Sequence, residues 1–374
     1  MIEKRMKKLV LIAAAWLSVG HAAAQYNISG QIAHHGGRVL LLVADASGRC
    51  DTLSNSISAD GTFRFTGMVS HPIAAEIEAV GTRLHIPVFI EDGKHYEVTA
   101  DTQRPIFYKI QGGGDLQKQR NEFHAQELRV EAMRDSVRNI WKKDYAPDDY
   151  FGQLQLRGMM EKIDDRYDII ENDFLSRHDN LVSADIVARR IKTLIRRKTL
   201  PAKYALLGEN ARRSVRGQWI KPYAEKIARI IPGGIAPDLR MVTPQGDSLF
   251  LSDIKARVKI LDFWASWCGP CRAENPNLKR IYEKYRSRGL EIVGISLDDK
   301  PGPWQKAIET DNLPWKHMSD LKGWNSIVCD IYEIHGIPHL FILDEHNRIL
   351  AERLRGKELE EFIAKLLDDN KDRE

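Results

Sequence analysis

The sequence of 374 residues predicts a multidomain α/β protein in which an all-β sandwich-like region and an α-helical region precede a C-terminal α/β domain. Three observations predict this. Short alternating runs lie between turn residues in 25–111, apolar residues recur every three or four positions in 112–231, and strands alternate with amphipathic helices in 232–374. At roughly 100–200 residues per domain, the length suits this division. With 43% hydrophobic and 29% charged residues, the composition excludes wholesale disorder.

Residues 1–24 have the three parts of a secretory signal peptide. The basic stretch Lys4–Lys8 is followed by the apolar stretch Leu9–Leu17 and by the small residues Ala22–Ala24. Because so short an apolar stretch cannot span a bilayer, we expect no stable membrane insertion. We expect cleavage after about Ala24 and release into the periplasm, an oxidising compartment in which paired cysteines carry out disulfide chemistry.

The region 25–111 is predicted to be a small antiparallel sandwich or barrel. Asp60-Gly61 and Asp92-Gly93 are turn signals between short strands. No group of side chains in this region forms a catalytic pattern. The expected strands are Tyr26–Ile32, Val39–Ala44, Thr62–Phe65, Ala74–Ala79, Val88–Glu91 and Tyr96–Thr99.

The region 112–231 begins at Gly112–Gly114 and is predicted to be helical. Its apolar positions include Ile163, Tyr167 and Ile170, and its basic residues gather in 189–198. That basic run could bind an anionic partner, or it could be the solvated face of a helix whose inner face carries apolar residues. We favour the solvated face and expect no nucleic-acid partner, because the run has no interleaved aromatic residues. The inner-face residues are Ile186, Ile191, Leu194 and Ile195.

The region 232–374 alternates strands with helices and so predicts a mixed sheet with helices on both faces. The expected strands are Val258–Trp264, Leu290–Ser296, Leu340–Leu343 and Ile349–Arg353. The expected helices are Asn277–Arg288, Trp304–Thr310, Trp324–Ile334 and Glu358–Leu367.

Two cysteines, Cys268 and Cys271, lie close together between an expected strand and an expected helix. Two intervening residues on the first turn of a helix let both sulfurs reach bonding distance. The leading sulfur then faces unpaired backbone N–H groups and the positive end of the helix dipole, which favours its thiolate form. Pro270 suits a first turn because it has no N–H to lose. We therefore expect Cys268 to attack and Cys271 to resolve.

This cysteine pair has three other interpretations. A structural disulfide is disfavoured because the pair follows Trp267 in a tight loop. A zinc site would need further ligands, and the available His335, His339 and Cys329 are not suitably spaced. A thiol peroxidase would carry Thr or Ser three residues before the cysteine, where this chain has Ala265. Dithiol–disulfide exchange is favoured over all three.

The segment Asp262–Arg272 resembles the active-site segment of the thioredoxin superfamily, and most closely its TlpA/ResA-like branch of exported thiol–disulfide oxidoreductases. Ala236–Asp238 and Gly336–Pro338 match further motifs of that branch in the same order. This resemblance covers about 235–370 and implies a thioredoxin-like fold there. The preceding regions resemble the N-terminal extensions of multidomain exported members from Bacteroides-like bacteria.

The resemblance implies a role for each matching residue. Cys268 would form a mixed disulfide with a partner, and Cys271 would release the reduced partner. Asp262 matches the buried acid of the family. Burial should raise the pKa of this carboxyl, which would then take the proton of Cys271 through a water. Pro338, if cis, would bring the Ile337 backbone beside the sulfurs, where an extended substrate could pair with it.

The remaining substrate-contacting positions are Trp267, Gly269 and Pro270. Trp267 would form an apolar lip, and the Gly269-Pro270 dipeptide is that of reducing thioredoxins. His339 stands where thioredoxins commonly carry Thr, and we expect it to be a polar strand residue.

The implied function is that of a protein-disulfide reductase with no metal and no cofactor beyond the redox-active Cys268–Cys271 pair. Its implied partners are disulfide-bearing exported proteins, such as apocytochrome c, and a membrane thiol carrier that donates electrons. A non-enzymatic alternative is a partner-binding protein in which residues 25–231 carry out the function.

Overall fold

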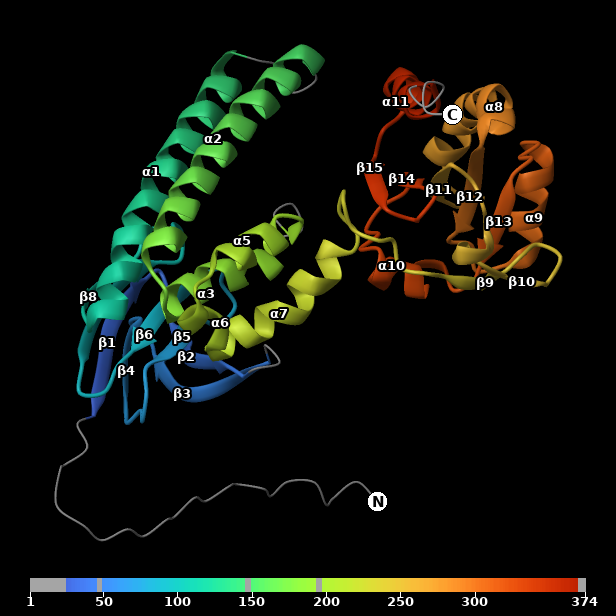
Figure 1. Cartoon of the computed structure of the whole chain (residues 1–374). Coiled ribbons are helices and arrows are strands. Elements are labelled where there is room, and N and C mark those ends of the chain that lie inside the picture. The colour runs from blue at the N-terminus through green and yellow to red at the C-terminus, as the bar shows by residue number, and fades with distance from the viewer. Residues whose placement is uncertain (1–24, 46–48, 145–148, 193–196, 369–374) are drawn as a thin grey trace, which may run out of the picture. The chain divides into compact units, whose positions relative to one another are not determined.

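The computed structural model describes residues 25–45, 49–144, 149–192 and 197–368 (Figure 1). They belong to two compact units, 1–174 and 175–374, and this division falls within a long helix. The expected signal peptide lies outside the described residues. Among the helices that are described, none combines the length and apolar character needed to cross a membrane.

The first unit contains two four-stranded sheets, with strand orders β4-β1-β7-β8 and β3-β2-β5-β6. Strands β1 and β7 pair in parallel, and the other neighbours pair antiparallel. Inward side chains of both sheets, such as Ile28 and Ile77, share one buried core. The strands are β1 (Tyr26–Ala33), β2 (Gly37–Ala44), β3 (Cys50–Ser58), β4 (Thr62–Gly67), β5 (Ile73–Ala79), β6 (His85–Ile90), β7 (His95–Asp101) and β8 (Lys109–Gly112).

Two of these strands, β3 and β8, are absent from the sequence prediction. Strand β3 is polar and lies at a sheet edge, so most of its side chains are exposed and the alternation of apolar residues is lost. Strand β8 has only four residues and ends at Gly112, within the glycine run that was interpreted as a break.

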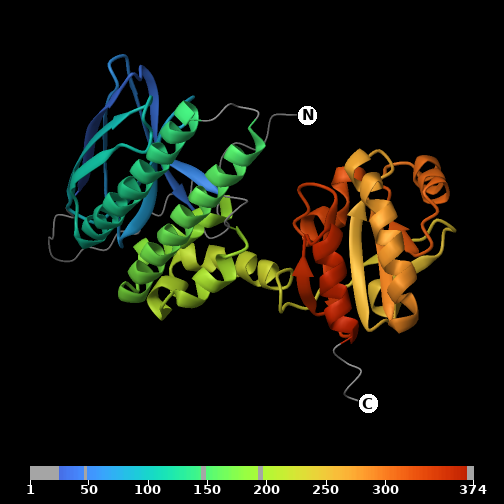
Figure 2. The ribbon, with the colours of Figure 1, turned by 90° about the horizontal axis from the view of Figure 1, so that it is seen from above.

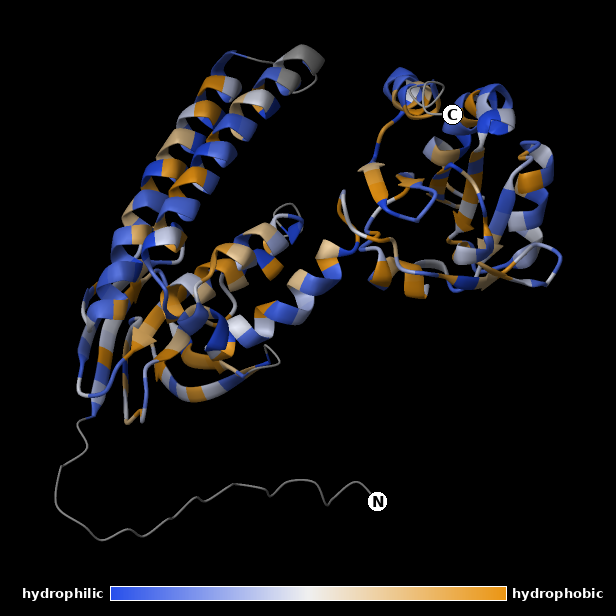
Figure 3. Ribbon diagram, viewed as in Figure 1, coloured by the Kyte–Doolittle hydropathy of each residue, from blue (hydrophilic) through white to orange (hydrophobic). Residues whose placement is uncertain are grey.

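Helices α1 (Asp115–Asp144) and α2 (Tyr150–Arg177) follow the sheets and are largely hydrophilic (Figure 3). The Gln117 side chain near the start of α1 accepts a hydrogen bond from the Phe89 backbone N–H at 2.9 Å, which ties the helix to β6. On α2, Ile163 is buried, as its helical spacing predicts.

A polar cluster lies where α1 meets the sheets. Arg120 donates to Glu127 at 2.8 Å and to the Tyr108 hydroxyl at 3.1 Å. The His124 ring stacks on the Tyr108 ring at 3.9 Å, and its Nδ1 lies 3.1 Å from Glu127. Every member of this cluster thus has a hydrogen-bonded or stacked neighbour.

The second unit begins with short helices around an apolar cluster that includes Leu175, Val187, Leu200 and Ile220. Of the expected inner-face residues, Ile186 and Ile191 are buried, whereas Leu194 and Ile195 lie outside the described residues. The helices are α3 (Leu181–Ala188), α5 (Leu200–Leu206), α6 (Glu209–Arg213) and α7 (Val215–Ala228).

A seven-stranded mixed sheet forms the rest of the second unit, in the order β10-β9-β13-β12-β11-β14-β15. Strands β13, β12 and β11 are parallel to one another, whereas β14 pairs antiparallel with β11 and β15 pairs antiparallel with β14. The strands are β9 (Arg240–Val242), β10 (Ser248–Phe250), β11 (Val258–Trp264), β12 (Leu290–Ser296), β13 (Lys316–Ser319), β14 (His339–Asp344) and β15 (Ile349–Glu352).

Helices pack against the seven-stranded sheet. Helices α8 (Gly269–Tyr285) and α11 (Gly356–Asp368) lie side by side on one face (Figures 1 and 2), and Glu360 of α11 pairs with Arg280 and Lys284 of α8 at 2.8 Å. The remaining helices are α9 (Pro301–Thr310) and α10 (Ile327–Ile331). The expected mixed sheet with helices is confirmed.

Three details of that prediction are wrong. The three-residue strands β9 and β10 are not among the expected strands. Strand β13 was not expected, because Lys316–Ser319 is short and polar and becomes a strand by pairing with β12. The helix expected over Trp324–Ile334 is a 3-10 turn, Gly323–Asn325, followed by the short α10, because Ser326 is extended and caps a new helix.

Candidate active site

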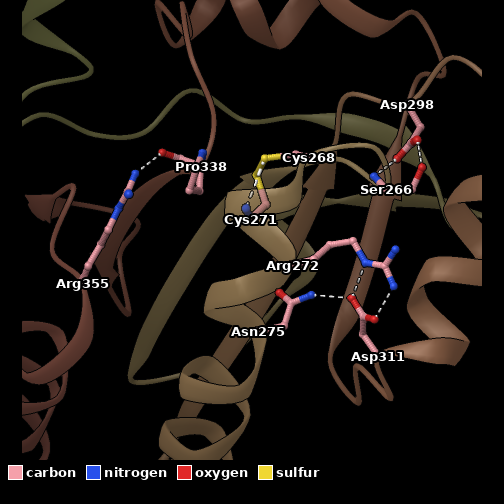
Figure 4. Close-up of a disulfide and its surroundings, with 9 residues drawn as sticks. All are labelled: Ser266, Cys268, Cys271, Arg272, Asn275, Asp298, Asp311, Pro338 and Arg355. Carbon is pink, nitrogen blue, oxygen red and sulfur yellow. Dashed lines mark hydrogen bonds and ion pairs between the residues drawn. A yellow bond between two sulfur atoms is a disulfide. The ribbon is translucent and has the colours of Figure 1, made fainter.

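Cys268 and Cys271 form a disulfide at the start of α8 (Figure 4). Cys268 is the N-cap residue of that helix, and its Sγ accepts a hydrogen bond from the Cys271 backbone N–H at 3.2 Å. Pro270 lies on the first turn, where no partner for an N–H is needed. The N-terminus of α8 therefore offers its positive end to the Cys268 sulfur, and it would favour a thiolate there after reduction.

The loop between β11 and α8 is held by one carboxylate. Asp298 accepts hydrogen bonds from the Ser266 backbone N–H at 2.9 Å and from the Ser266 hydroxyl at 2.5 Å. Asp298 also accepts a bond from Ser296 at the end of β12. These contacts fix the backbone two residues before Cys268, so the position of the leading sulfur is set by the sheet.

The start of α8 is also anchored from its other side. Arg272 binds Asp311 through two hydrogen bonds of 2.9 and 2.6 Å, and Asn275 donates to the same carboxylate at 2.9 Å (Figure 4). Arg272 and Asn275 follow Cys271 on the same helix, so this pairing limits the movement of the helix turn that carries Cys271.

The sulfurs themselves are largely buried, with 5% of Cys268 and 2% of Cys271 exposed. Space is nevertheless open nearby, because a Cβ added at Gly269 or at Gly336 would meet no atom within 4 Å. Both glycines are exposed, on the loops that carry the cysteines and the cis-proline.

Trp267 is exposed beside this opening and does not stand alone. Its ring lies 6.1 Å from the ring of Trp324, and the two side chains are about half exposed. The exposed apolar surface at Trp267 thus includes a second tryptophan, and its role as a lip for substrate stays a prediction. Trp324 was missed as a site residue because it lies 57 positions further along the chain, in a turn with no recognisable motif.

The Ile337–Pro338 peptide bond is cis and directly precedes β14. Pro338 lies beside the disulfide, and its carbonyl oxygen accepts a hydrogen bond from Arg355 at 2.6 Å (Figure 4). Arg355 follows β15 and was not predicted as a site residue, since only the register of the β14–β15 hairpin brings it back to Pro338.

Asp262 lies in the middle of β11, between Gly294 of β12 and Leu340 of β14 in the register of the sheet, and is only 4% exposed. Burial raises the pKa of Asp262 to about 7; the negative charge of Glu274 acts in the same direction, whereas Arg355 opposes it. The carboxyl can therefore gain or lose a proton near neutral pH.

His339 is a polar residue of strand β14, as expected, and it is buried. Its Nε2 lies 3.2 Å from Glu352, and its ring stacks on Phe341 at 4.8 Å. Burial lowers the pKa of His339, so the neutral ring is favoured. Glu352 in turn pairs with Lys198. These contacts give His339 a structural role.

The other two cysteines lie outside this disulfide: Cys50 is exposed and Cys329 is part-buried. His335, one of the zinc ligands considered above, contacts Glu333 at 3.1 Å. Within the described ranges, no three His, Cys, Asp or Glu side chains gather as a metal-binding group.

Comparison with known proteins identifies the same part of the chain. Residues 232–351 match the model of the AhpC/TSA family. The thiol:disulfide interchange protein HelX of Rhodobacter capsulatus is 33% identical over 141 residues, which are 37% of this chain and 76% of HelX. The thiol–disulfide oxidoreductase ResA of Bacillus cereus is 26% identical over 148 residues, which are 38% of this chain and 83% of ResA.

Solved structures match this part as well. The crystal structure of the thioredoxin domain of a thiol–disulfide oxidoreductase from Bacteroides vulgatus is 33% identical, with a TM-score of 0.35, and the match covers 36% of this chain and 97% of that domain.

Proposed function

The chain belongs to the thiol–disulfide oxidoreductases, the family of ResA and HelX, and from this premise we propose that it is exported and reduces disulfides of other exported proteins through Cys268 and Cys271. One observation carries the proposal. The two cysteines form a disulfide at the N-terminus of a helix, beside a cis-proline loop and next to open space. This is the oxidised form that such a cycle would produce.

In the proposed cycle the reduced protein gives two electrons to a partner disulfide. The Cys268 thiolate attacks one partner sulfur, the partner S–S bond breaks, and the released partner sulfur takes up a proton. The Cys271 thiol then loses its proton and attacks the Cys268 sulfur of the mixed disulfide. The second partner sulfur leaves as a thiolate, and the Cys268–Cys271 disulfide is formed.

Asp262 is proposed as the group that takes the proton of Cys271, through a water. Its buried carboxyl has a pKa of about 7, so near neutrality a substantial fraction is ionised and can accept a proton. An ordinary aspartate would be a much weaker base, because its pKa is about 4.

The partners follow from the proposed compartment. The signal-peptide pattern in residues 1–24 favours export to the periplasm. A reductase in an oxidising compartment must itself be reduced again, so a membrane thiol carrier is the proposed electron donor. The proposed acceptors are disulfide-bearing exported proteins, and they include apocytochrome c, whose C-x-x-C-H cysteines carry the haem.

Reduction of insulin by dithiothreitol tests this function. The protein should accelerate the reaction, and Cys268→Ser should remove the acceleration, because no thiolate remains to open the insulin disulfide. Cys50→Ser is the matched control and should keep full activity, since Cys50 lies in β3 of the first unit. Unchanged turnover by Cys268→Ser would refute the assignment.

A thiol peroxidase remains the second candidate, because residues 232–351 match the AhpC/TSA family model. Consumption of hydrogen peroxide in a thiol-coupled assay separates the two functions. We expect insulin to be reduced much faster than peroxide, since Ala265 stands where a peroxidatic site carries Thr or Ser.

A further inference from the structure

A groove with a volume of about 450 Å³ opens beside the cis-proline loop. One wall is the loop itself, from Glu333 to His339, together with Arg353 and Arg355 after β15. The opposite wall comes from the helical part of the same unit and includes Arg197 and Lys198. The volume falls within the range of about 300–1,000 Å³ that is usual for ligand sites.

The groove is electropositive. Four basic side chains line it, Arg197, Lys198, Arg353 and Arg355, against one acidic side chain, Glu333. Arg197 and Lys226 both pair with Glu333, so this carboxylate is already neutralised from within the protein. Positive charge is therefore left over in the groove.

Most of this positive charge lies on the two exposed arginines that follow β15, Arg353 and Arg355. The Arg353 side chain is 64% exposed, and in its ion pair with Glu352 the two side chains are 4.0 Å apart. Glu352 is also held by Lys198 and His339. Arg355 is exposed and donates one N–H to Pro338, which leaves other guanidinium donors for a ligand.

Arg197 and Lys198 differ from the solvated helix face expected from the sequence. Arg197 donates to Glu333 and to the Ile191 carbonyl oxygen, and both basic side chains are only part-exposed. The helical region thus supplies one wall of a groove that begins at the proposed substrate-binding loop. This region can therefore influence which partners are accepted.

We propose that this groove selects partners with an acidic segment next to the target cysteine, an inference that rests on the proposed reductase function. A substrate strand that pairs with the loop at Ile337 passes Pro338 and enters the groove. Carboxylates on that strand then meet the guanidinium groups of Arg353 and Arg355, whose planar geometry suits carboxylate binding. The pair Trp267 and Trp324 offers an apolar surface instead.

Three synthetic peptides provide the test. They share one internal disulfide and differ only in whether Asp, Asn or Lys residues flank the cysteine that is attacked. The full chain is assayed at low salt with dithiothreitol as reductant, and kcat/KM is measured for each peptide. We expect the Asp peptide to exceed the Asn peptide by about threefold to tenfold and the Lys peptide to be the poorest, with the differences shrinking at high salt.

Substitutions in the groove test whether its arginines cause the preference for the Asp peptide. Arg353→Glu should abolish or reverse the preference for the Asp peptide, and Arg353→Gln should reduce it. Arg240→Glu is the matched control, since Arg240 is exposed on β9, near the opposite edge of the sheet from β15, and it should keep the preference. A thermal-unfolding measurement of each variant confirms that it is folded.

The outcomes separate this inference from the proposed function. If the protein reduces none of the peptides, the reductase function itself fails. If it reduces all three equally well, the function stands and the acidic-segment proposal is overturned. A preference that survives Arg353→Glu unchanged would overturn the assignment of the groove.

Discussion

Two acidic side chains, one in each unit, are both removed from water and yet differ in their pKa. Glu127 on α1 is four-fifths buried; burial opposes its charge, but Arg120 and His124 lower its pKa to about 2. Asp262 on β11 is almost fully buried, and burial raises its pKa to about 7 because only Arg355 acts in the opposite direction.

The difference separates a structural carboxylate from one suited to chemistry. Glu127 is in direct contact with the Arg120 guanidinium and the His124 ring, so it stays charged at every ordinary pH, fixes these two side chains and exchanges no proton. Asp262 lies on β11, the strand that leads to the Cys268 loop, and only the charge of Arg355 offsets the effect of its burial, so it can change its charge near pH 7. Ionising the buried Asp262 carboxyl lowers the stability of the folded protein. Carboxyl groups with such raised pKa values are typical of functional sites. The following experiments test this contrast.

The largest effect is expected from Asp262→Asn on stability. The raised pKa means that, between about pH 4 and 7, the folded protein keeps a proton that the unfolded chain has lost. Wild-type stability therefore falls as the pH rises through this window. Removing the charge should stabilise the oxidised second unit at pH 8 by on the order of 2–4 kcal/mol, with little effect at pH 4.

Denaturant unfolding at pH 4 and pH 8 measures this gain. Asp299→Asn is the control, because Asp299 is exposed and close in sequence to the same sheet. If the Asp262→Asn protein is no more stable than wild type at pH 8, the charge on the buried carboxyl does not destabilise the fold.

Glu127→Gln should act in the opposite direction. It leaves the buried guanidinium of Arg120 without its carboxylate, and we expect the first unit to lose about 1–3 kcal/mol at pH 7. The lowered pKa means that the stabilisation is fully present above about pH 4.5 and is lost as the pH falls toward about 2. Unfolding followed in the first unit measures it, with the exposed Glu122→Gln on the same helix as control. Equal stability of the two variants would contradict the structural role.

The smallest effect concerns the rate of mixed-disulfide resolution. In wild type this rate should rise with pH through about 7, because only the ionised Asp262 accepts the Cys271 proton. Asp262→Asn should slow the step by at least about tenfold at pH 8 and remove this pH dependence. Stopped-flow measurement of partner release would show it. An unaltered pH profile would mean that another group takes the proton.

The sequence is most informative where burial follows a simple pattern. The observed bounds of β11 and β12 match the prediction, since both are continuous apolar runs, and the disulfide lies in the predicted pair of cysteines. Strand β3 and strand β13 were missed for the opposite reason, because their polar residues become strands through pairing with neighbours.

The site residues that were missed are brought to their partners by contacts between distant parts of the chain. Arg355 reaches Pro338 only through the turn of the β14–β15 hairpin, and Trp324 meets Trp267 across two loops. Arg197 belongs to a basic run whose spacing is that of a solvated helix, and only the fold brings it to Glu333. Spacing along the chain does not specify such contacts, because they depend on tertiary packing.

The central claim is that Cys268 forms the covalent link to the partner. Cys271→Ser removes the thiol that would release the partner, so incubation of this reduced variant with an oxidised test protein should accumulate a one-to-one adduct. Mass spectrometry of the digested adduct should place the link at Cys268, and dithiothreitol should dissolve it. A link at Cys50 or Cys329, or no adduct at all, would contradict the account.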